Sequence, residues 1–332
     1  MIRFRPFQRR PVSLVTGGAG FVGSHLVLEL VERGEKVVII DDLSTGEVRN
    51  LGAAISSGGA IFLHADVAVA ASTLRELLER AGIGELDAIY HLASPASPQA
   101  YTAHPWETLK VNSLGTMSLI EIALERGARM LYASSTGVDA DSLEDLDIGE
   151  YLAGDPTGPR AGYTQAKRFG EAAMSCAIRT HGLGGRVVRL ANCYGPMMNT
   201  RDGRLIPSLV GAVLERRPLP IYGTGLQSRA MTYVEDAVEL MVRVMHAEYP
   251  AFEPVDTATD DERSVLDIAR TLAGVAGVPF EVDHLAVRAG DAERRKPNST
   301  VARSIGWKPQ TSLEEGLKRT MEWYNSERPC FA

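Results

Sequence analysis

Residues 12–31 read VSLVTGGAGFVGSHLVLELV, and this stretch decides the fold. A short apolar run ends at Gly17, and apolar residues with helical spacing follow from Phe21. Glycines stand at positions 17, 20 and 23. In a strand–turn–helix unit, the first glycine allows a tight turn, the second lets a pyrophosphate approach the backbone, and the third lets the helix pack on the strand. The stretch therefore predicts the start of a dinucleotide-binding domain.

Strand-like and helix-like segments alternate through the first half of the chain. Apolar runs at 36–41, 60–65, 88–92, 128–134 and 186–192 predict strands, and residues 105–126 and 162–180 predict long helices. The strands are continuously apolar, as expected for a parallel sheet that is covered on both faces. We predict an α/β fold with a Rossmann-like, doubly wound parallel sheet.

The alternation of strand-like and helix-like segments becomes less regular after about Gly195. Residues 195–204 and 222–229 are typical of loops, and helices are expected at 204–215, 234–245, 264–276 and 312–326. We predict a Rossmann domain over residues 1–195, which includes the catalytic helix, and a smaller C-terminal lobe over residues 196–332. Some chain is expected to cross between the two.

Composition excludes several classes of protein. The chain has 332 residues and a net charge of −7, so a nucleic-acid binder is not expected. No apolar run approaches the ~20 residues of a membrane span, and the basic N-terminus leads into the glycine turn instead of a signal-peptide core. Three cysteines without a C-x-x-C pair argue against a disulfide framework, and no histidine pair with metal-ligand spacing is present. We expect a soluble, cytoplasmic protein without a metal.

An acidic residue follows the glycine turn at the expected distance. Asp41 ends the apolar run KVVIID, roughly 20 residues after the turn. A carboxylate there can accept both hydroxyls of an adenosine ribose, and it would repel a 2′-phosphate. Because no arginine adjoins Asp41, the sequence predicts NAD as cofactor in preference to NADP.

A tyrosine and a lysine have the spacing of one helical turn. Tyr163 and Lys167 lie at i and i+4, so they share one face of the predicted helix. A nearby ammonium favours the tyrosinate, and the phenol can then act as a base. Ser134 and Ser135 end the preceding strand, where open α/β sheets bind ligands. The spacing alone is common on helix surfaces, but together with the glycine turn and Asp41 it predicts a catalytic site.

These features resemble the extended short-chain dehydrogenases/reductases that act on nucleotide sugars, and most closely the UDP-glucuronate decarboxylases, or UDP-xylose synthases. The matching stretches, from residue 13 to about 324, are TGGAGFVGSHL, HLASPASP, LKVNSLGT, GPRAGYTQAKR, RDGR, YGTGLQSRAMTYVEDAV, RRKPN and IGWKPQTSLEEGL. The resemblance implies an NAD-binding domain, a nucleotide-sugar-binding lobe and a UDP-sugar substrate. It also implies a homodimer through a four-helix interface built from the helices at 105–126 and 162–180.

The resemblance implies roles for individual residues. Tyr163 takes the proton of the sugar C4 hydroxyl, Lys167 tunes Tyr163 and holds the nicotinamide ribose, and Ser135 bonds the same hydroxyl. The implied cofactor-binding residues are Gly17, Gly20, Phe21, Val22, Gly23, Asp41, Asp42, Ser44, Thr45, Gly46, Asp66, Val67, Leu92, Ser94, Tyr163 and Lys167. The implied substrate-binding residues are Lys110, Asn192, Arg204, Arg229 and Arg295, with Arg295 near the substrate carboxylate.

One position departs from the family pattern. Relatives usually carry glutamate where this chain has Gly137, and the related 4,6-dehydratases carry an Asp-Glu pair at the positions of Thr136 and Gly137. Water elimination needs an acid and a base, so dehydration is disfavoured here. Whether Asp139 or Asp141 replaces the missing carboxylate stays open.

Decarboxylation needs no acid–base pair of carboxylates. Oxidation at C4 turns the C6 carboxylate into a β-keto acid, which loses carbon dioxide without a base. We predict NAD-dependent decarboxylation of UDP-glucuronate through a 4-keto intermediate to UDP-xylose, UDP-4-keto-pentose or both. The alternatives are a UDP-glucuronate or UDP-sugar 4-epimerase, and a non-catalytic NAD-binding sensor.

Overall fold

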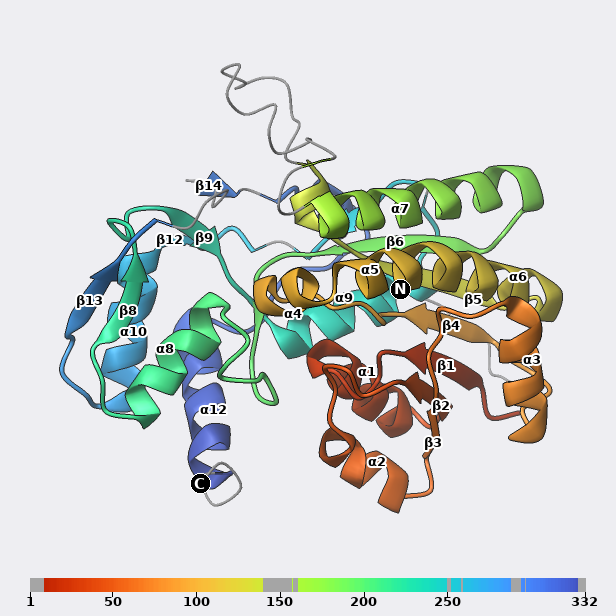
Figure 1. The fold of residues 1–332 in the computed structure, drawn as a ribbon, viewed down its shortest axis with the longest axis horizontal. Helices are drawn as coiled ribbons and strands as arrows, with labels where there is room; N and C mark the ends of the chain where they lie inside the picture. The colour runs from red at the N-terminus through yellow and green to blue at the C-terminus, as the bar shows by residue number, and fades with distance from the viewer. Residues whose placement is uncertain are drawn as a thin grey trace. The chain divides into compact units, whose positions relative to one another are not determined.

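The computed structural model describes residues 9–139, 157, 161–249, 252–257, 259–287, 294–295 and 297–327 (Figure 1). For Asp139, Arg294 and Arg295 the description is limited to the backbone. The chain divides into two compact units. The first holds described residues within Met1–Ala96, Ala100–Arg189 and Val238–Val255, and the second holds those within Ser97–Gln99, Leu190–Ala237 and Asp256–Ala332.

A seven-stranded sheet forms the centre of the first unit, in the order β11-β6-β5-β4-β1-β2-β3. Its strands are β1 (Val12–Thr16), β2 (Lys36–Asp41), β3 (Ala60–His64), β4 (Ala88–His91), β5 (Arg129–Ser135), β6 (Gly185–Leu190) and β11 (Val255–Asp256). The neighbours from β3 to β5 all pair in parallel. The predicted fold class, a doubly wound parallel sheet of Rossmann type, is confirmed.

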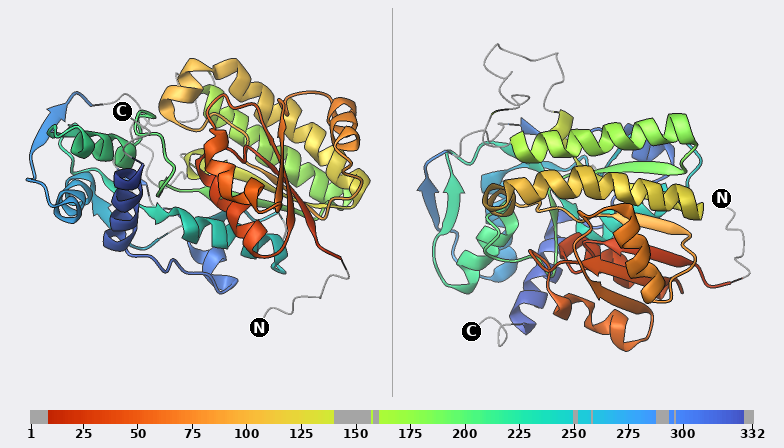
Figure 2. Two further views of the ribbon diagram at one scale, coloured as in Figure 1. Left: turned by 90° about the horizontal axis from the view of Figure 1, so that it is seen from below. Right: turned by 45° about the vertical axis from the view of Figure 1, so that its right-hand side comes forward.

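Helices connect these strands. They are α1 (Phe21–Glu32), α2 (Gly52–Ser56), α3 (Ala71–Arg80), α4 (Pro98–Ala103), α5 (Pro105–Lys110), α6 (Thr116–Arg126), α7 (Ala161–His181) and α9 (Val234–His246), with 3₁₀ turns η1 (Val48–Leu51) and η3 (Thr136–Asp139). The helices α5 and α6 follow each other end to end, and α7 runs beside them (Figure 2). No helix among the described residues is long and apolar enough to cross a membrane.

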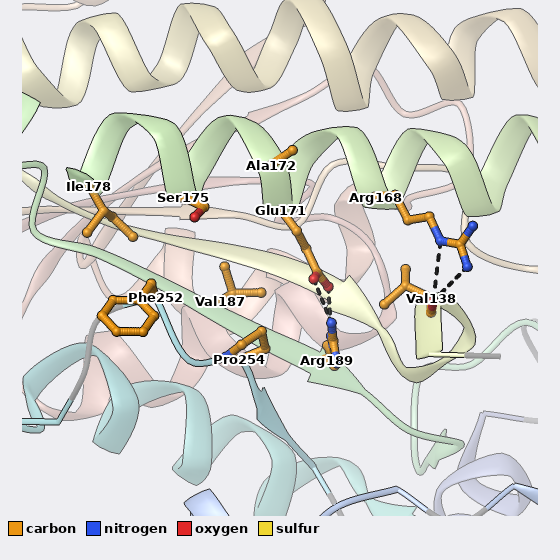
Figure 3. Close-up of a pocket in the computed structure, with 10 residues that line it drawn as sticks. All are labelled: Val138, Arg168, Glu171, Ala172, Ser175, Ile178, Val187, Arg189, Phe252 and Pro254. Atoms are coloured by element: carbon orange, nitrogen blue, oxygen red, sulfur yellow. Dashed lines mark hydrogen bonds and ion pairs between the residues drawn. The ribbon is translucent and has the colours of Figure 1, made fainter. Parts of the chain in front are cut away.

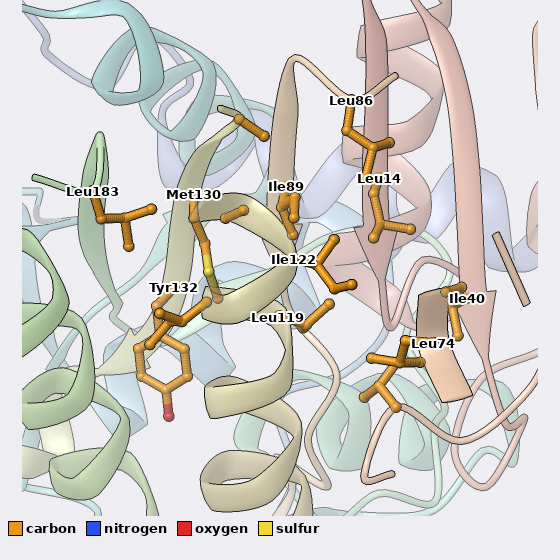
Figure 4. Close-up of a cluster of buried hydrophobic side chains, with 14 of the residues drawn as sticks. Leu14, Ile40, Leu74, Leu86, Ile89, Leu119, Ile122, Met130, Tyr132 and Leu183 are labelled. Carbon is orange, nitrogen blue, oxygen red and sulfur yellow. The ribbon is translucent and has the colours of Figure 1, made fainter. Parts of the chain in front are cut away.

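The alternation of side chains along the strands gives the sheet two apolar faces. On one face, Leu14, Ile40 and Ile89 pack with Leu119 and Ile122 of α6 in a large buried cluster (Figure 4). On the other face, Val15 and Ile39 lie near Val27 of α1, where the three side chains surround Gly18. Burial on both faces explains why these strands are apolar throughout.

The predicted helix over residues 105–126 is helical along its length but not uniformly α-helical. A π-helical turn, η2 (Val111–Gly115), separates α5 from α6. Such a turn inserts an extra residue into the helix and is frequent at functional sites. The apolar spacing of the sequence did not reveal it, and the short helices α3 and α4 were also missing from the expectations.

The second unit combines helices with very short strands. Its elements are β7 (Cys193–Tyr194), α8 (Leu205–Leu214), β8 (Leu219–Tyr222), β9 (Ser228–Ala230), β10 (Thr232–Tyr233), β12 (Glu262–Ser264), α10 (Val265–Ala276), β13 (Val282–Leu285), β14 (Arg294–Arg295), α11 (Thr300–Ser304) and α12 (Leu313–Ser326). The strands form three small sheets, β10-β7, β12-β9-β14 and β13-β8. The expectation of a loop over 222–229 was wrong at both ends, because Tyr222 belongs to β8, and Ser228 and Arg229 pair with β12 and β14.

Close packing of α7 on β5 depends on one glycine. A Cβ at Gly170 would lie 2.2 Å from Cζ of Tyr132, a buried ring whose hydroxyl donates to Asn112 Oδ1 at 2.8 Å. We expect Gly170→Ala to lower the free energy of unfolding by about 1–3 kcal/mol, the usual cost of overpacking a core. Urea unfolding measures this. Gly162→Ala is the control, because its Cβ would meet Pro105 at an ordinary 3.6 Å; equal stability of the two variants would contradict the expectation.

Candidate active site

The carboxyl ends of five neighbouring parallel strands meet at one edge of the sheet in the first unit. The glycine turn follows β1, Asp41 ends β2, and Asp66 follows β3. Leu92 and Ser94 come after β4, and Ser135 ends β5. In open α/β sheets this edge is where ligands bind. The topology therefore brings the predicted cofactor residues together from distant parts of the sequence.

Backbone geometry explains two of the glycines in the turn between β1 and α1. Gly17 has φ +72°, and a Cβ there would lie 2.6 Å from the backbone nitrogen of Ala93. A Cβ on Gly23 would lie 2.1 Å from the carbonyl oxygen of Gly17. Gly20 is the N-cap residue of α1, so the helix begins without a side-chain cap. Phe21 and Val22 lie in the first turn of the helix. The N-terminal end of α1 thus presents backbone, which favours an anion.

Asp41 is joined to this turn by hydrogen bonds. The Ala19 amide donates to Asp41 Oδ2 at 2.9 Å, and the Leu43 amide donates to Oδ1 at 2.8 Å. Burial raises the pKa of the Asp41 carboxyl, and these two amide donors oppose the rise. Each carboxylate oxygen can accept more than one bond, so Asp41 retains capacity for ribose hydroxyls.

The loop after β2 closes against the same turn. Asp42 Oδ1 accepts from the Ser44 amide at 2.9 Å and from the Ser44 hydroxyl at 2.7 Å. Thr45 is exposed, and Gly46 abuts Ala19, since a Cβ on Gly46 would lie 2.8 Å from the Ala19 carbonyl carbon. These residues form a short rim beside Asp41.

The remaining predicted cofactor residues follow β3 and β4. Asp66 is exposed, and its Oδ1 accepts from the Ala68 amide at 2.7 Å, while Val67 is buried. Leu92 continues the pairing with β1, because its amide donates to the Thr16 carbonyl at 3.0 Å. Ser94 Oγ accepts from Asn112 Nδ2 at 2.9 Å. The polar groups at this edge are therefore held by local hydrogen bonds.

The three predicted catalytic side chains come from β5 and α7. The Gly137 amide donates to Ser135 Oγ at 3.2 Å, which leaves the hydroxyl proton available for a substrate oxygen. The Tyr163 ring stacks on Tyr101, with ring centroids 4.8 Å apart and planes 18° apart. Lys167 is 3% exposed, and its Nζ donates to the Ala133 carbonyl at 2.8 Å. The ammonium is thus fixed one residue before the serine pair.

Burial dominates the electrostatics around Lys167. It lowers the pKa of Lys167 to about 7, and attraction by Glu171 opposes this fall. Tyr132 packs under the ammonium, with Nζ 5.0 Å from its ring, and burial raises the Tyr132 pKa well above its ordinary value. Burial, assisted by the Lys167 charge, lowers the pKa of His91 to about 3. At neutral pH, His91 and Tyr132 are therefore uncharged neighbours of a lysine that titrates.

Three of the predicted substrate residues gather at β9 in the second unit. Arg229 is 7% exposed, and its Nη1 donates to the Ser228 carbonyl at 2.6 Å. Arg295 of β14 pairs in register with Arg229. Asn192, with φ +28°, donates from Nδ2 to the Ala230 carbonyl at 3.2 Å. Strand pairing thus places the backbones of Arg229 and Arg295 side by side, and a side-chain hydrogen bond holds Asn192 at the end of the same strand.

The other predicted substrate residues stand elsewhere. Arg204 precedes α8 in the second unit and donates from Nε to Asp202 Oδ2 at 2.6 Å. Lys110, in the first unit, is exposed, with Nζ 5.9 Å from the Trp106 ring centroid. Asp141 and the Asp139 side chain lie outside the described residues, so the structure does not test them as replacements for a carboxylate at Gly137.

A buried polar network behind the site was missing from the predictions. Asn112, in the π-helical turn, is fully buried and donates from Nδ2 to Ser94 Oγ and to the Thr108 carbonyl. It also accepts from the Tyr132 hydroxyl. The signal was present in the sequence, since LKVNSLGT places polar side chains on the inner face of an otherwise apolar helix.

The residues present fit NAD. The backbone cradle at Gly17 and Gly23 would be filled by a Cβ at either position, and Asp41 supplies the acceptor that an adenosine ribose requires. No group of three or more histidine, cysteine, aspartate or glutamate side chains that could hold a metal occurs within the described ranges.

Comparison with known proteins agrees with this geometry. Residues 13–254 match the model of the family described as "NAD dependent epimerase/dehydratase family". The chain belongs to the NAD-dependent epimerase/dehydratase family. It is an NAD-dependent enzyme of the extended short-chain dehydrogenase/reductase type, as the sequence predicted, and NAD is its cofactor.

Its curated relatives include UDP-glucuronic acid decarboxylases. The chain is 36% identical over 328 residues to UDP-glucuronic acid decarboxylase 1 of Xenopus tropicalis, covering 98% of this chain and 75% of that protein. It is 35% identical over 314 residues to UDP-glucuronic acid decarboxylase 1 of Arabidopsis thaliana, covering 94% and 69% respectively.

Solved structures of related enzymes share the fold. UDP-glucose 4-epimerase from Thermotoga maritima, solved with UDP-glucose, superposes with a TM-score of 0.82 at 28% identity, covering 96% of this chain and 99% of that chain. A dTDP-glucose 4,6-dehydratase from Streptomyces venezuelae, solved with NAD bound, has a TM-score of 0.82 at 27% identity, covering 96% and 98%. The family thus contains several reactions, and the site residues must distinguish them.

Proposed function

We propose that this enzyme decarboxylates UDP-glucuronate through a 4-keto intermediate. The observation that carries the proposal is at the end of β5: Ser135 supplies a hydroxyl, but Thr136 and Gly137 supply no carboxylate. An elimination would need an acid and a base there, whereas loss of carbon dioxide from a β-keto acid needs neither. The names of the curated relatives support the same substrate.

The chain's own residues suffice for the protein's part in this chemistry. Tyr163 takes the proton of the C4 hydroxyl, and Lys167 stabilises the resulting phenolate. NAD, when bound, accepts the C4 hydride and can return it. The C5–C6 bond then breaks, carbon dioxide leaves, and the bonding electrons pass to the C4 oxygen. Ser135 and the protonated Tyr163 donate hydrogen bonds to that oxygen, and C5 is protonated afterwards.

Gly137 bears on the product. A Cβ there would meet Ser135 Oγ at 3.4 Å, an ordinary contact, so the backbone does not require glycine. The glycine therefore leaves the sugar without the polar side chain that relatives have at this position, although the backbone could accommodate one. We propose that the 4-keto pentose is held less firmly for this reason, and that UDP-4-keto-pentose is released beside UDP-xylose.

Release of carbon dioxide separates the proposal from the 4-epimerase hypothesis, which the epimerase structures among the neighbours favour. A decarboxylase liberates carbon dioxide from UDP-glucuronate in proportion to product, whereas an epimerase retains the carboxylate. A non-catalytic sensor would give neither product, and the set Ser135, Tyr163 and Lys167 argues against it.

Cofactor selectivity follows from Asp41. We expect activity with NADP to be at least ~10-fold below that with NAD, because a 2′-phosphate would face a buried carboxylate. Initial rates with each cofactor at matched concentrations measure this. Equal rates would show that Asp41 does not face the adenosine ribose.

Arg295 is assigned to the substrate carboxylate by the family resemblance, and its backbone lies beside Arg229. We expect Arg295→Ala to reduce kcat/KM for UDP-glucuronate by about 10-fold or more, the loss of one charge-assisted hydrogen bond, while UDP affinity changes little. Steady-state kinetics and UDP titration by calorimetry measure the two effects. A parallel loss of UDP affinity would assign Arg295 to the diphosphate.

A homodimer through a four-helix interface is part of the proposal. Trp106, Leu114 and Met117 on α5 to α6, together with Phe169 on α7, are large apolar side chains that remain exposed. These helices pack beside one another, so the four side chains belong to one helical layer (Figure 2). A second copy of the chain would cover these side chains. Sedimentation equilibrium gives the molecular mass and so distinguishes a dimer from a monomer.

A cytoplasmic location stays a prediction.

A further inference from the structure

A partly buried ion pair lies one helical turn beyond the predicted catalytic lysine. Glu171 follows Lys167 at i+4 on α7, so both side chains lie on the same face of the helix. Arg189 of β6 donates from Nε to Glu171 Oε1 and from Nη2 to Oε2, both at 2.8 Å. The two side chains are only 15% and 17% exposed. This geometry is bidentate, which fixes the carboxylate in one orientation.

The pair stands in the wall of a pocket of about 510 Å³ in the first unit (Figure 3). The lining side chains near it are mostly apolar, among them Val138, Val187 and Phe252. Arg168, on the same wall, donates to the Val138 carbonyl at 3.0 Å through Nη2. The Glu171 carboxylate is therefore held in place by Arg189 in the pocket wall.

The charged and titratable groups around Lys167 come from four elements. Tyr163 and Glu171 share its helix, Tyr132 lies on β5 and His91 on β4. Tyr132 and His91 are uncharged near neutral pH because burial moves their pKa values away from that range. Arg168 on α7 and Arg189 on β6 carry the positive charges that line the pocket with Glu171. Attraction on the ammonium comes from Glu171.

We propose that Glu171, clamped by Arg189, is a positioning residue that keeps the buried Lys167 in its ammonium form. The Ala133 carbonyl orients this ammonium, but a neutral oxygen compensates only part of the cost of burying a charge. The fixed carboxylate one turn away offsets part of the remaining cost, so more of Lys167 is protonated at neutral pH than burial alone would permit. The Arg189 clamp prevents the carboxylate from swinging onto Lys167 and pulling it away from Tyr163.

The inference can be tested on the protein without substrate. The chain contains six lysines, at 36, 110, 167, 296, 308 and 318, so a lysine carrying ¹³C at Cε gives few NMR signals. Loss of one signal in Lys167→Met assigns the buried lysine, and its shift is then followed against pH. In the wild type the midpoint is expected near 7.

Opposite shifts in two variants are the expected result. Glu171→Gln removes the attraction, so the Lys167 midpoint falls by about one pH unit, as expected for one charge a helical turn away at an effective dielectric constant of ~20–40. Arg189→Met removes a competing positive charge, so the midpoint rises. A purely structural pair would behave differently, because loosening either side admits water and raises the midpoint in both variants.

Glu125→Gln serves as a matched control, and a double variant of Glu171 and Arg189 replaces Glu171→Gln if that variant does not fold. Glu125→Gln breaks another bidentate pair, Arg75 with Glu125 between α3 and α6, and should leave the Lys167 midpoint unchanged. If Glu171→Gln does not fold, the double variant Glu171→Leu with Arg189→Met replaces the pair by apolar side chains, and the midpoint should fall. A rise in both single variants, a rise in the double variant, or no shift beyond the control would overturn the inference.

The effect on turnover rests on the proposed function. With UDP-glucuronate, the high-pH limb of the kcat/KM profile of Glu171→Gln should move to lower pH together with the lysine midpoint. Because the NMR titration needs no substrate, an incorrect choice of substrate would leave the titration result intact.

Discussion

Replacement of Tyr163 by phenylalanine is expected to lower the turnover of UDP-glucuronate by about 10²- to 10⁴-fold, the usual contribution of a positioned acid–base group. The phenol is the group that removes the C4 proton and later donates to the C4 oxygen. Deletion of one oxygen changes little volume, and the ring keeps its stack on Tyr101. NAD affinity and the unfolding midpoint should therefore stay near the wild-type values.

Tyr101→Phe is the matched control for this variant. It removes a hydroxyl from the other ring of the same stacked pair, so any general disturbance of the stack would appear in both variants. The measurement is kcat for carbon dioxide release, with NAD binding followed by calorimetry. A Tyr163→Phe enzyme that retains a rate within a few-fold of wild type would remove Tyr163 from the catalytic role.

Gly23→Ala is expected to weaken NAD binding by about 10- to 100-fold. The new Cβ would lie 2.1 Å from the Gly17 carbonyl oxygen, and this backbone atom cannot rotate away as a side chain can. The start of α1 must then move off the turn, which separates the helix N-terminus from the phosphate site. Overpacking of this kind costs about 1–3 kcal/mol, and each 1.4 kcal/mol is a factor of ten in affinity.

Calorimetric titration with NAD measures the loss. Gly52→Ala is the control, because Gly52 begins α2 in the same unit and a Cβ added there would meet no other atom within 4 Å. Affinity within two-fold of wild type for Gly23→Ala would mean that the turn between β1 and α1 does not hold the cofactor.

The sheet and its long helices were predictable because burial on two faces makes each strand a continuous apolar run. The order of strands and turns then placed Gly17, Asp41 and Ser135 at one edge, since parallel strands share their carboxyl ends. The resemblance added the identities of the cofactor and of the substrate class. Structure and comparisons confirmed the fold class, the family and NAD.

Other features escaped prediction for physical reasons. A π-helical turn at 111–115 changes the helix by one residue, less than apolar spacing can resolve. The strands of the second unit are two to four residues long, too short to show a period of two. The Glu171–Arg189 pair joins residues 18 positions apart on different elements, so only the tertiary fold brings them together.

The central claim is that the enzyme removes the carboxylate of a nucleotide sugar, and one measurement tests it most directly. The enzyme is incubated with NAD and UDP-glucuronate carrying ¹³C at C6, and the products are followed by ¹³C NMR while NADH absorbance is recorded. We predict that the label appears in carbon dioxide and bicarbonate, that UDP-xylose and UDP-4-keto-pentose together form in equal amount, and that NADH accumulates in proportion to UDP-4-keto-pentose. Label that remains in a UDP-hexuronate with inverted C4 would contradict decarboxylation and identify an epimerase instead.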